Sequence, residues 1–324
     1  MATAGEVLNA FDNIRRAQHA GVYAPHKPLL ILLALGRVQR GEPRMVEFSE
    51  VDAPLRALLG EFGPSSAAKS RHYPFWHLAT DGRGALWDLN GPKDVLTRPA
   101  GATPSLGELR RRHIAGGFAT DIDAALRQTP GLLQDVARRV LDAYFPATLH
   151  ADIAAAVGLD LEQPPQAADS AGADARYADA PVRRRDPSFR ERVLRAYEYR
   201  CCVCGFDLRI GHAPAGLEAA HIQWHQFGGP DIEPNGLSLC ALHHKLFDLG
   251  VFTIEPSEYR VTFSQHAISG GRGMSGELQY HGRAIHAPQR SELLPASEYL
   301  LWNASGPFKR PARPVARAKP RAKR

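Results

Sequence analysis

The stretch of sequence that decides the fold of the C-terminal half runs from residue 217 to residue 248. It contains three short segments, LEAAHI at 217–222, NGLSLC at 235–240 and HHKLFD at 243–248. A GGPD segment at 228–231 lies between the first two and is typical of a loop that reverses the chain. Because histidine, asparagine and carboxylate side chains are set among apolar residues here, the stretch indicates chemistry as well as packing.

Two metal-binding spacings enclose this stretch. Cys201-x-x-Cys204 and Cys240-x-x-His243 are separated by 35 intervening residues. Each short spacing allows a tight turn to direct two ligands at one ion, and four such ligands complete the tetrahedron that structural zinc prefers. All four cysteines of the chain lie between 201 and 240, which favours a metal site over disulfides. We expect Cys202 to be a spare buried thiol, and the alternative is a chance grouping of core cysteines.

Together these segments resemble the HNH endonuclease family, specifically its zinc-containing branch with AAHI and NGL-LC-x-x-HH-x-x-FD motifs. The resemblance covers about fifty residues. It implies a ββα-metal fold, a β-hairpin followed by a helix around one catalytic cation. It assigns His221 as general base and His244 as metal ligand, and it gives Asn235 the task of fixing the hairpin and orienting the His221 ring or reaching the metal. Neighbouring helical residues point about 100° apart, so His243 would face the zinc instead.

Phosphodiester hydrolysis explains these residue types, because it needs a base for water and a cation for the developing charge. One position departs from the family pattern. Many HNH enzymes have an aspartate ligand immediately before the first histidine, and here that residue is Ala220. Glu218 and Asp248 are the candidate replacements as ligands of a catalytic Mg²⁺ or Mn²⁺. Trp224 and His225 are candidates for DNA contact or for packing.

The N-terminal half reads as a mixed helical and β domain. Apolar spacing predicts helices over 7–20, 28–38 and 122–144, and a short strand or hairpin over 82–89. The composition divides the chain into a reader domain at 1–160, a linker at 161–185, a nuclease domain at 186–307 beginning with a helix near 190–199, and a basic disordered tail at 308–324. The expected class is α+β.

Three segments of the N-terminal half, YAPHKPLL at 23–30, YPFWHL at 73–78 and LW at 86–87, carry a second resemblance. They look like the sulfur-binding domain of phosphorothioated-DNA-dependent, type IV restriction endonucleases, in which such a domain precedes an HNH domain. The resemblance implies double-stranded DNA with sulfur in place of one non-bridging phosphate oxygen. Sulfur is larger and less hydrated than oxygen, so a shallow apolar cup flanked by cations would favour it.

The resemblance places the sulfur cup around Tyr73 and Pro74. The side chains expected to hold the DNA backbone or a base edge are His26, Lys27, Arg71, His72, Arg98, Arg110, Arg111 and Arg112. For His26 a helix-capping role competes with a phosphate contact. Phe75 and Trp76 fit the core better than the DNA surface, and residues 110–112 could equally form a solvated helix face.

The net charge of +6 is concentrated at the end of the chain. Residues 309–324 hold eight Lys and Arg and no acid, so taking those eight charges from +6 leaves the remainder at −2. Such a tail can attract phosphates or can simply keep the protein in solution. No apolar run approaches the ~18 residues of a membrane helix, and no signal peptide is evident, so we expect a cytoplasmic protein with no membrane partner.

These observations predict a modification-dependent restriction endonuclease that recognises phosphorothioated DNA and cuts it with an HNH site. Cutting both strands needs two nuclease heads, so a homodimer is expected. The alternatives are an HNH endonuclease that reads another mark, such as methylcytosine, and a DNA-binding regulator with an inactive HNH fold.

Overall fold

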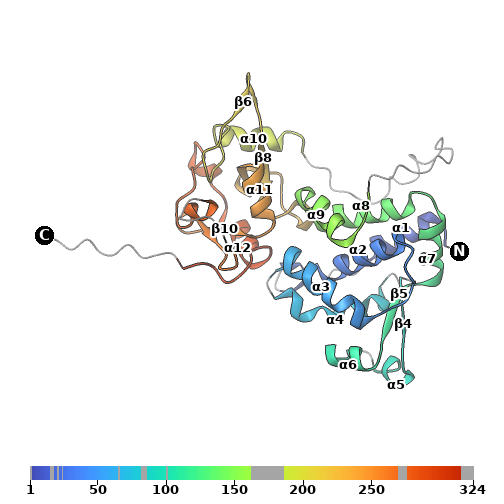
Figure 1. Ribbon diagram of the computed structural model, residues 1–324. Helices are drawn as coiled ribbons and strands as arrows, with labels where there is room; N and C mark the ends of the chain where they lie inside the picture. Colours follow the sequence, from blue (N-terminus) through green and yellow to red (C-terminus); the bar gives the residue numbers. More distant parts are fainter. Residues whose placement is uncertain are drawn as a thin grey trace. The chain divides into compact units, whose positions relative to one another are not determined.

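The computed structural model describes residues 2–14, 18–19, 22–23, 25–64, 66–81, 86–99, 101–161, 186–268 and 276–314. The chain divides into two compact units, residues 1–183 and 184–324 (Figure 1). The predicted linker at 161–185 lies, apart from its first residue, outside the described residues. Each unit is considered by itself below.

The N-terminal unit is built of helices around a small antiparallel sheet. Its helices are α1 (Ala4–Asp12), α2 (His26–Gln39), α3 (Phe48–Phe62), α4 (His72–His77), α5 (Lys93–Leu96), α6 (Leu106–Arg111), α7 (Thr120–Gln128), α8 (Leu132–Tyr144) and α9 (Ala147–Val157). The strands are β1 (Gln18–His19), β2 (Val22–Tyr23), β3 (Val46–Glu47), β4 (Trp87–Asn90) and β5 (Ala115–Phe118). The sheet order is β3-β5-β4, and β1 pairs with β2 as a separate ribbon.

Aromatic rings fill the space between the sheet and helix α4. The rings of Phe75 and Trp87 meet edge to face at 5.8 Å, and Trp87 meets Phe118 at 5.6 Å. Gly116 on β5 allows this approach, because a Cβ there would lie 2.7 Å from the Trp87 indole nitrogen and 2.9 Å from the Phe75 ring. The core therefore fixes the place of α4, which carries the YPFW segment. Phe75 is a core residue, as the sequence favoured.

The element predictions hold in part. The helix predicted at 28–38 is α2, whereas the helix predicted at 7–20 ends at Asp12, and residues 18–19 form a strand. The strand predicted at 82–89 is β4, and residues 82–85 lie outside the described part. The helix predicted at 122–144 is two helices, because Gly131 adopts a left-handed conformation with φ of 78° between them.

The C-terminal unit contains a β-hairpin followed directly by a helix. Its elements are α10 (Phe189–Ala196), β6 (Arg209–Ile210), β7 (Ala213–Pro214), β8 (Leu217–His221), β9 (Gly236–Cys240), α11 (Ala241–Asp248), β10 (Phe252–Glu255), β11 (Arg260–Phe263) and α12 (Ser297–Ser305). Strands β8 and β9 are antiparallel, with Leu217 opposite Cys240 and His221 opposite Gly236. Gly236 lets helix α10 approach, because a Cβ there would meet Val193 at 2.4 Å. The ββα arrangement expected from the sequence is therefore present.

The predicted start of the basic tail is wrong. Phe308 is buried, and the backbone N–H of Arg313 donates to the carbonyl of Phe263 on β11. Residues 308–314 are thus part of the C-terminal unit, because they continue from α12 along the edge of the β10–β11 hairpin. Residues 315–324 lie outside the described part. Among the described residues no helix has the length and apolar content to cross a membrane.

Candidate functional site

His221 ends strand β8 and is held by a carboxylate. Its Nε2 lies 2.7 Å from Oδ1 of Asp231, and its ring stacks on Phe189 at 4.2 Å between centroids with an 18° interplanar angle. The His221 side chain keeps 14% of its surface exposed. Burial raises the pKa of Asp231, but the hydrogen bonds from the Asp186 amide and from His221 outweigh burial, so its pKa is lowered overall. The histidine is therefore oriented against an ionised carboxylate, with part of its surface open to solvent.

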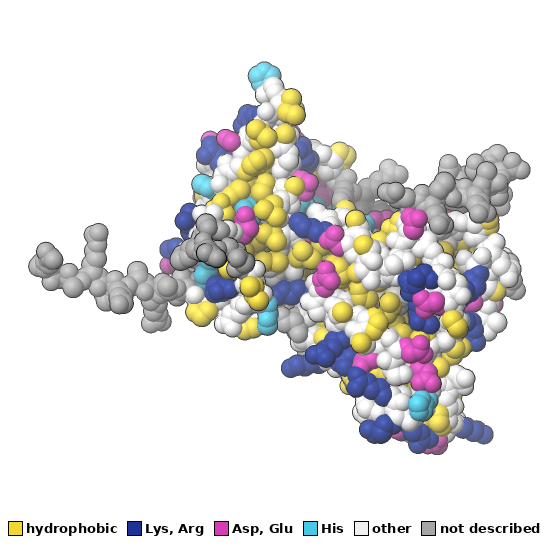
Figure 2. Space-filling model, viewed as in Figure 1, with side chains coloured by type: hydrophobic (Ala, Val, Ile, Leu, Met, Phe, Trp, Pro, Cys, Tyr) yellow, Lys and Arg dark blue, Asp and Glu magenta, His cyan; other side chains and the backbone are white. Residues whose placement is uncertain are grey.

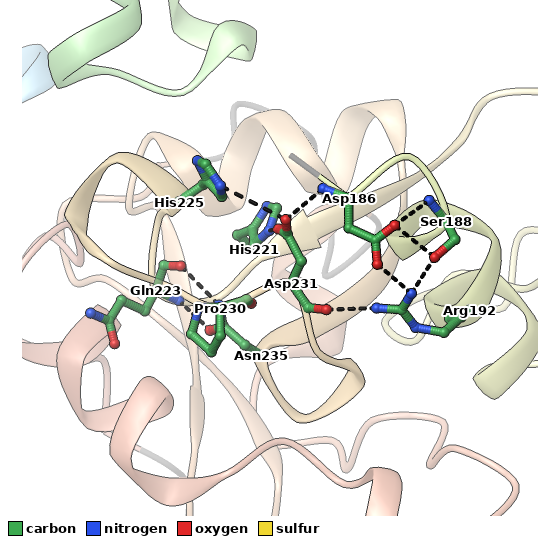
Figure 3. Close-up of polar contacts among 9 residues, drawn as sticks. All are labelled: Asp186, Ser188, Arg192, His221, Gln223, His225, Pro230, Asp231 and Asn235. Atoms are coloured by element: carbon green, nitrogen blue, oxygen red, sulfur yellow. Dashed lines mark hydrogen bonds and ion pairs between the residues drawn. The ribbon is translucent and has the colours of Figure 1, made fainter. Parts of the chain in front are cut away.

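Asn235 holds the loop that carries Asp231. Its side-chain oxygen accepts from the backbone N–H of Gln223 at 2.8 Å, and its amide nitrogen donates to the carbonyls of Gln223 and Pro230, each at 3.0 Å (Figure 3). The residue is fully buried. Of the roles expected for Asn235, these contacts match the fixing of the hairpin. Its polar atoms are directed at the backbone, and the side chain that meets the His221 ring nitrogen is Asp231.

The two glycines of the loop explain how it closes. Gly228 has a positive φ of 81°, which favours glycine. A Cβ on Gly229 would lie 1.8 Å from the carbonyl oxygen of Gln223 and 2.9 Å from the Asn235 amide nitrogen. The GG pair is thus required for Asn235 to bridge the loop, and through that bridge for the position of Asp231.

A second cluster joins strand β8 to helix α11. His244 Nδ1 lies 2.5 Å from Glu218 Oε2, and its Nε2 lies 3.2 Å from Asp248 Oδ2. Burial acts to lower the pKa of His244, but the two carboxylates outweigh burial and raise it to about 9. Asp248 is buried and Glu218 is half exposed. His244 thus contacts both candidate replacements for the missing aspartate, one at each ring nitrogen. Because the two carboxylates lie at opposite nitrogens, these three side chains do not converge on one point as the Cys₃His group does, and a cation held by all three would require them to turn.

Trp224 and His225 belong to the interior of the site. The Trp224 indole donates to Asp248 Oδ1 at 3.2 Å, and the ring packs against Trp302 at 5.8 Å. His225 is buried, with its Nε2 3.8 Å from Asp231 Oδ2. The packing alternative applies to both residues, and Trp224 connects the loop after His221 to the cluster around His244.

Three cysteines and one histidine converge as the spacing predicted. The ligand atoms of Cys201, Cys204, Cys240 and His243 all lie within 4.8 Å of one another. The hydrogen bond between the Cys201 and Cys240 thiols lowers the pKa of Cys201 and raises that of Cys240 to about 12. A largely buried Cys₃His group of this size fits a tetrahedral metal ion, which would displace the thiol protons. Cys202 is fully buried, as expected.

In the N-terminal unit Tyr73 is the exposed member of the YPFW segment. Its side chain is 47% exposed, whereas Pro74 and Phe75 are buried and Trp76 is half buried. The Tyr73 ring lies parallel to His77 at 6.0 Å and against His72 at 4.3 Å. The apolar surface predicted here is therefore presented by Tyr73, and Pro74 lies beneath the surface.

The histidines near Tyr73 lie in surroundings that favour their neutral forms. Burial lowers the pKa of His26, His72 and His77, and neighbouring positive charges lower it further for His72 and His77. His26 Nε2 lies 2.7 Å from the carbonyl of Ala67 and forms no helix cap, so the capping alternative is wrong. His26 instead ties the start of α2 to the segment that leads into α4.

Most of the cations predicted to hold DNA are paired with carboxylates of the same unit. Asp52 is buried and binds two of them, Arg71 at 2.5 Å and Arg110. Lys27 lies 2.6 Å from the fully buried carboxylate of Asp81. Two further pairs are Arg98 with Glu108 and Arg112 with Asp94. These contacts fix the directions of the cations before any ligand arrives.

Arg111 differs from its neighbours. It is exposed, and within the described parts of the chain it forms no ion pair. Helices α5 and α6 lie at one end of the unit beyond strands β4 and β5 (Figure 1), and Lys and Arg side chains gather at that end in Figure 2. The alternative of a solvated helix face remains open for Arg111, whereas Arg110 is part of the network around Asp52.

Comparison with known proteins decides the nature of both units. Residues 4–162 match the family of ScoMcrA-like DNA sulfur-binding domains, and residues 201–255 match the HNH endonucleases. The chain joins a DNA sulfur-binding domain to an HNH endonuclease domain. Both resemblances drawn from the sequence are confirmed, as is the α+β class with a mixed N-terminal domain and a C-terminal HNH domain.

Solved structures similar to the sulfur-binding domain include three from ScoMcrA. The sulfur-binding and SRA domains complexed with phosphorothioated DNA are 26% identical, with 47% of this chain and 46% of that chain covered and a TM-score of 0.42. The sulfur-binding domain complexed with phosphorothioated DNA is 24% identical, with 49% and 96% covered and a TM-score of 0.41. The type IV phosphorothioation-dependent restriction endonuclease ScoMcrA is 25% identical, with 47% and 28% covered and a TM-score of 0.39. No curated protein sequence matches this chain.

Proposed function

We propose that this protein is a modification-dependent restriction endonuclease, which recognises phosphorothioated DNA with its N-terminal domain and hydrolyses phosphodiester bonds with its HNH domain. The observation that carries the proposal is the union of a DNA sulfur-binding domain and an HNH domain in one chain. The HNH domain keeps its three signature residues, and His221 is oriented by a carboxylate while part of its side chain stays exposed.

In the proposed reaction His221 is the general base that takes a proton from the attacking water. Glu218, Asp248 and His244 would hold Mg²⁺ or Mn²⁺, which when bound would neutralise charge on the phosphate and on the departing 3′ oxygen. Asp248 would bind the cation from the interior of the domain, because it is buried and accepts a hydrogen bond from the Trp224 indole. Glu218 would face the substrate side, because it is half exposed.

Structural zinc in the Cys₃His group would tie the turn at Cys201 to the junction of β9 and α11. Cys240 ends β9, and His243 lies in the first turn of α11, so one ion would fix the direction in which the helix leaves the hairpin. His244 is the next residue, and its ring is already turned toward Glu218. The zinc would therefore set the geometry of the cation cluster without taking part in hydrolysis.

For recognition, we propose that Tyr73 covers the sulfur atom with apolar surface while the paired arginines hold the flanking phosphates. Burial lowers the pKa of the three neighbouring histidines, which favours neutral rings beside Tyr73. An ordinary phosphate oxygen would lose hydration there without a matching gain, whereas sulfur loses less. Cutting of both strands would need two HNH domains, so we propose that a homodimer acts on double-stranded DNA.

One plasmid, prepared with and without phosphorothioate, tests the proposal. The protein should cut the modified plasmid in Mg²⁺ or Mn²⁺ and leave the unmodified one intact. His221→Ala should abolish cutting, while His212→Ala, which changes an exposed histidine of the β6–β7 hairpin, should not. Equal digestion of both plasmids would leave a nuclease that does not depend on sulfur, and binding without any metal-dependent cutting would leave a regulator with an inactive HNH fold.

A further inference from the structure

The carboxylate of Asp231 has partners from different parts of the HNH domain. One oxygen lies 2.7 Å from His221 Nε2, and the other accepts the backbone N–H of Asp186 at 2.7 Å and lies 3.8 Å from His225 Nε2. Figure 3 shows Asp231 between the His221 ring and the guanidinium of Arg192. Asp186 is the first described residue of this unit, so the carboxylate that meets the proposed base also meets the beginning of the described part of the unit.

Residues 186–192 form a compact hook around that carboxylate. Asp186 Oδ1 accepts from the backbone N–H and the hydroxyl of Ser188, at 2.9 and 2.8 Å. Arg192 donates to Asp186 Oδ2 at 2.7 Å and to the carbonyl of Asp231 at 2.6 Å. Arg192 also lies 3.2 Å from Glu233. The hook therefore grips the Asp231 backbone through Arg192 and its side chain through the Asp186 amide.

We propose that Asp231 is a positioning residue for hydrolysis, and that the hook at 186–192 holds the Asp231 carboxylate against Nε2 of His221. The inference rests on the proposed function, in which His221 is the general base. It adds which tautomer of His221 takes part. A neutral imidazole carries one ring proton, and a carboxylate beside Nε2 keeps that proton on Nε2. The lone pair is then on Nδ1, which becomes the atom that takes the proton from water.

The surroundings of the ring support a protonated Nε2 and a basic Nδ1. Phe189 covers one face of the His221 ring in a stacked contact, which opposes ring rotation. The groups around the ring and its carboxylate include the Asp186 amide, His225 at 5.8 Å between ring centroids, and the Arg192 guanidinium on the Asp231 carbonyl. Asp231 is in direct contact with the ring, so it also stabilises the imidazolium that forms when Nδ1 accepts a proton.

The alternative is that the contact between Asp231 and His221 only closes the loop. Asn235 already bridges that loop to the backbone at two carbonyls, independently of the Asp231 carboxylate. Replacing the carboxylate by an amide of equal size should therefore leave the loop in place. The two roles can be separated by chemistry, because only a positioning role depends on which ring nitrogen carries the proton.

The first test is single-turnover cleavage of phosphorothioated plasmid by Asp231→Asn as the full chain with saturating Mn²⁺. We expect the rate to fall about 100-fold or more with DNA affinity and melting temperature unchanged. The acid limb of the pH–rate profile should move to lower pH, because His221 without its carboxylate partner loses its proton more readily. Asp231→Glu should recover part of the rate. A rate within threefold of wild type with an unmoved acid limb would overturn the proposal.

The second test separates the hook from the rest of helix α10. Arg192→Ala should lower the single-turnover rate about tenfold without changing DNA affinity, because the grip on Asp231 loosens. Arg195→Ala is the matched control, since Arg195 lies on the same helix, is exposed and contacts Glu191 at 3.5 Å. Equal effects of the two substitutions would contradict a specific hook.

The outcome also distinguishes this inference from the proposed function. If His221→Ala cuts modified DNA normally, the assignment of the general base fails and Asp231 has nothing to position. If His221→Ala is inactive while Asp231→Asn is fully active, the proposed function stands and only the positioning role is lost.

Discussion

Both domains place carboxylates against positively charged or titratable side chains, but the partners differ. In the sulfur-binding domain the partners are arginines and a lysine, with Asp52 holding Arg71 and Arg110 and Asp81 holding Lys27. In the HNH domain they are histidines, with Asp231 beside His221 and Glu218 and Asp248 beside His244.

Arginine and lysine stay protonated at physiological pH, so a carboxylate can only fix their position. Histidine gains and loses a proton in this range, so a carboxylate at one ring nitrogen, as at His221, also decides which nitrogen is free. The same pairing thus holds cations in the domain proposed to read DNA and orients a histidine in the domain proposed to cut it. Changes in the two domains should therefore affect different measurements.

The largest expected effect is loss of the Cys₃His metal site. Cys204→Ser, or removal of zinc with a chelator, should unfold the HNH domain, because structural zinc contributes about 10 kcal/mol or more to such a fold. The sulfur-binding domain has its own core and should keep its melting transition. Calorimetry with parallel zinc analysis should show one transition lost and one retained, and a Cys204→Ser protein that stayed folded and metal-free would contradict the zinc assignment.

The next effect in size is on the proposed base. His221→Ala should slow cleavage of modified DNA by about 10²–10⁴-fold, the usual contribution of a general base, while DNA affinity stays within twofold. Single-turnover rates and equilibrium binding on the same oligonucleotide would check this. A parallel loss of binding would show that His221 belongs to recognition as well, and the comparison between the domains would fail.

A smaller effect is expected from Tyr73 in the sulfur-binding domain. Tyr73→Ala should reduce the preference for phosphorothioated over ordinary DNA about tenfold, because it removes the exposed apolar surface of the YPFW segment. Tyr73→Phe should retain the preference, since the ring and not the hydroxyl covers the sulfur. Competition binding with matched duplexes would measure the ratio of affinities for phosphorothioated and ordinary DNA. An unchanged ratio in Tyr73→Ala would mean that the sulfur-binding surface lies elsewhere.

The smallest expected effect concerns Arg111. Arg111→Ala should weaken binding of modified and ordinary DNA equally, and it should reduce the slope of log affinity against log salt by about one. Arg138→Ala on helix α8 is the control, because Arg138 is exposed and already lies near Asp135. If Arg111→Ala changed neither affinity nor slope, residues 110–112 would contain no direct phosphate contact.

The sequence predicted the parts of the site that local spacing determines. Cys201 and Cys204, like Cys240 and His243, lie three residues apart, so one turn brings each pair together whatever the rest of the chain does. His244 and Asp248 are four residues apart on α11 and meet for the same reason. Helix α2 followed from apolar periodicity, whereas the ββα order was implied by the resemblance to HNH endonucleases.

The sequence did not predict contacts that depend on tertiary closure. Asp231 lies in the quoted GGPD loop, but its approach to His221 requires the bridge from Asn235 and the hook at 186–192. Asp52 and Arg110 are 58 residues apart, and no local pattern links them. The presence of an aspartate directly after a Gly-Gly-Pro turn beside the proposed base was the one available signal for Asp231.

The most direct test of the account measures binding and cutting on one phosphorothioated duplex with wild type, Tyr73→Ala and His221→Ala. The account predicts that Tyr73→Ala loses the preference for modified DNA but cuts the DNA that it binds at the wild-type single-turnover rate. It predicts that His221→Ala keeps that preference and does not cut. If His221→Ala lost the preference, or if Tyr73→Ala retained it and lost cutting, the division between a reading domain and a cutting domain would be contradicted.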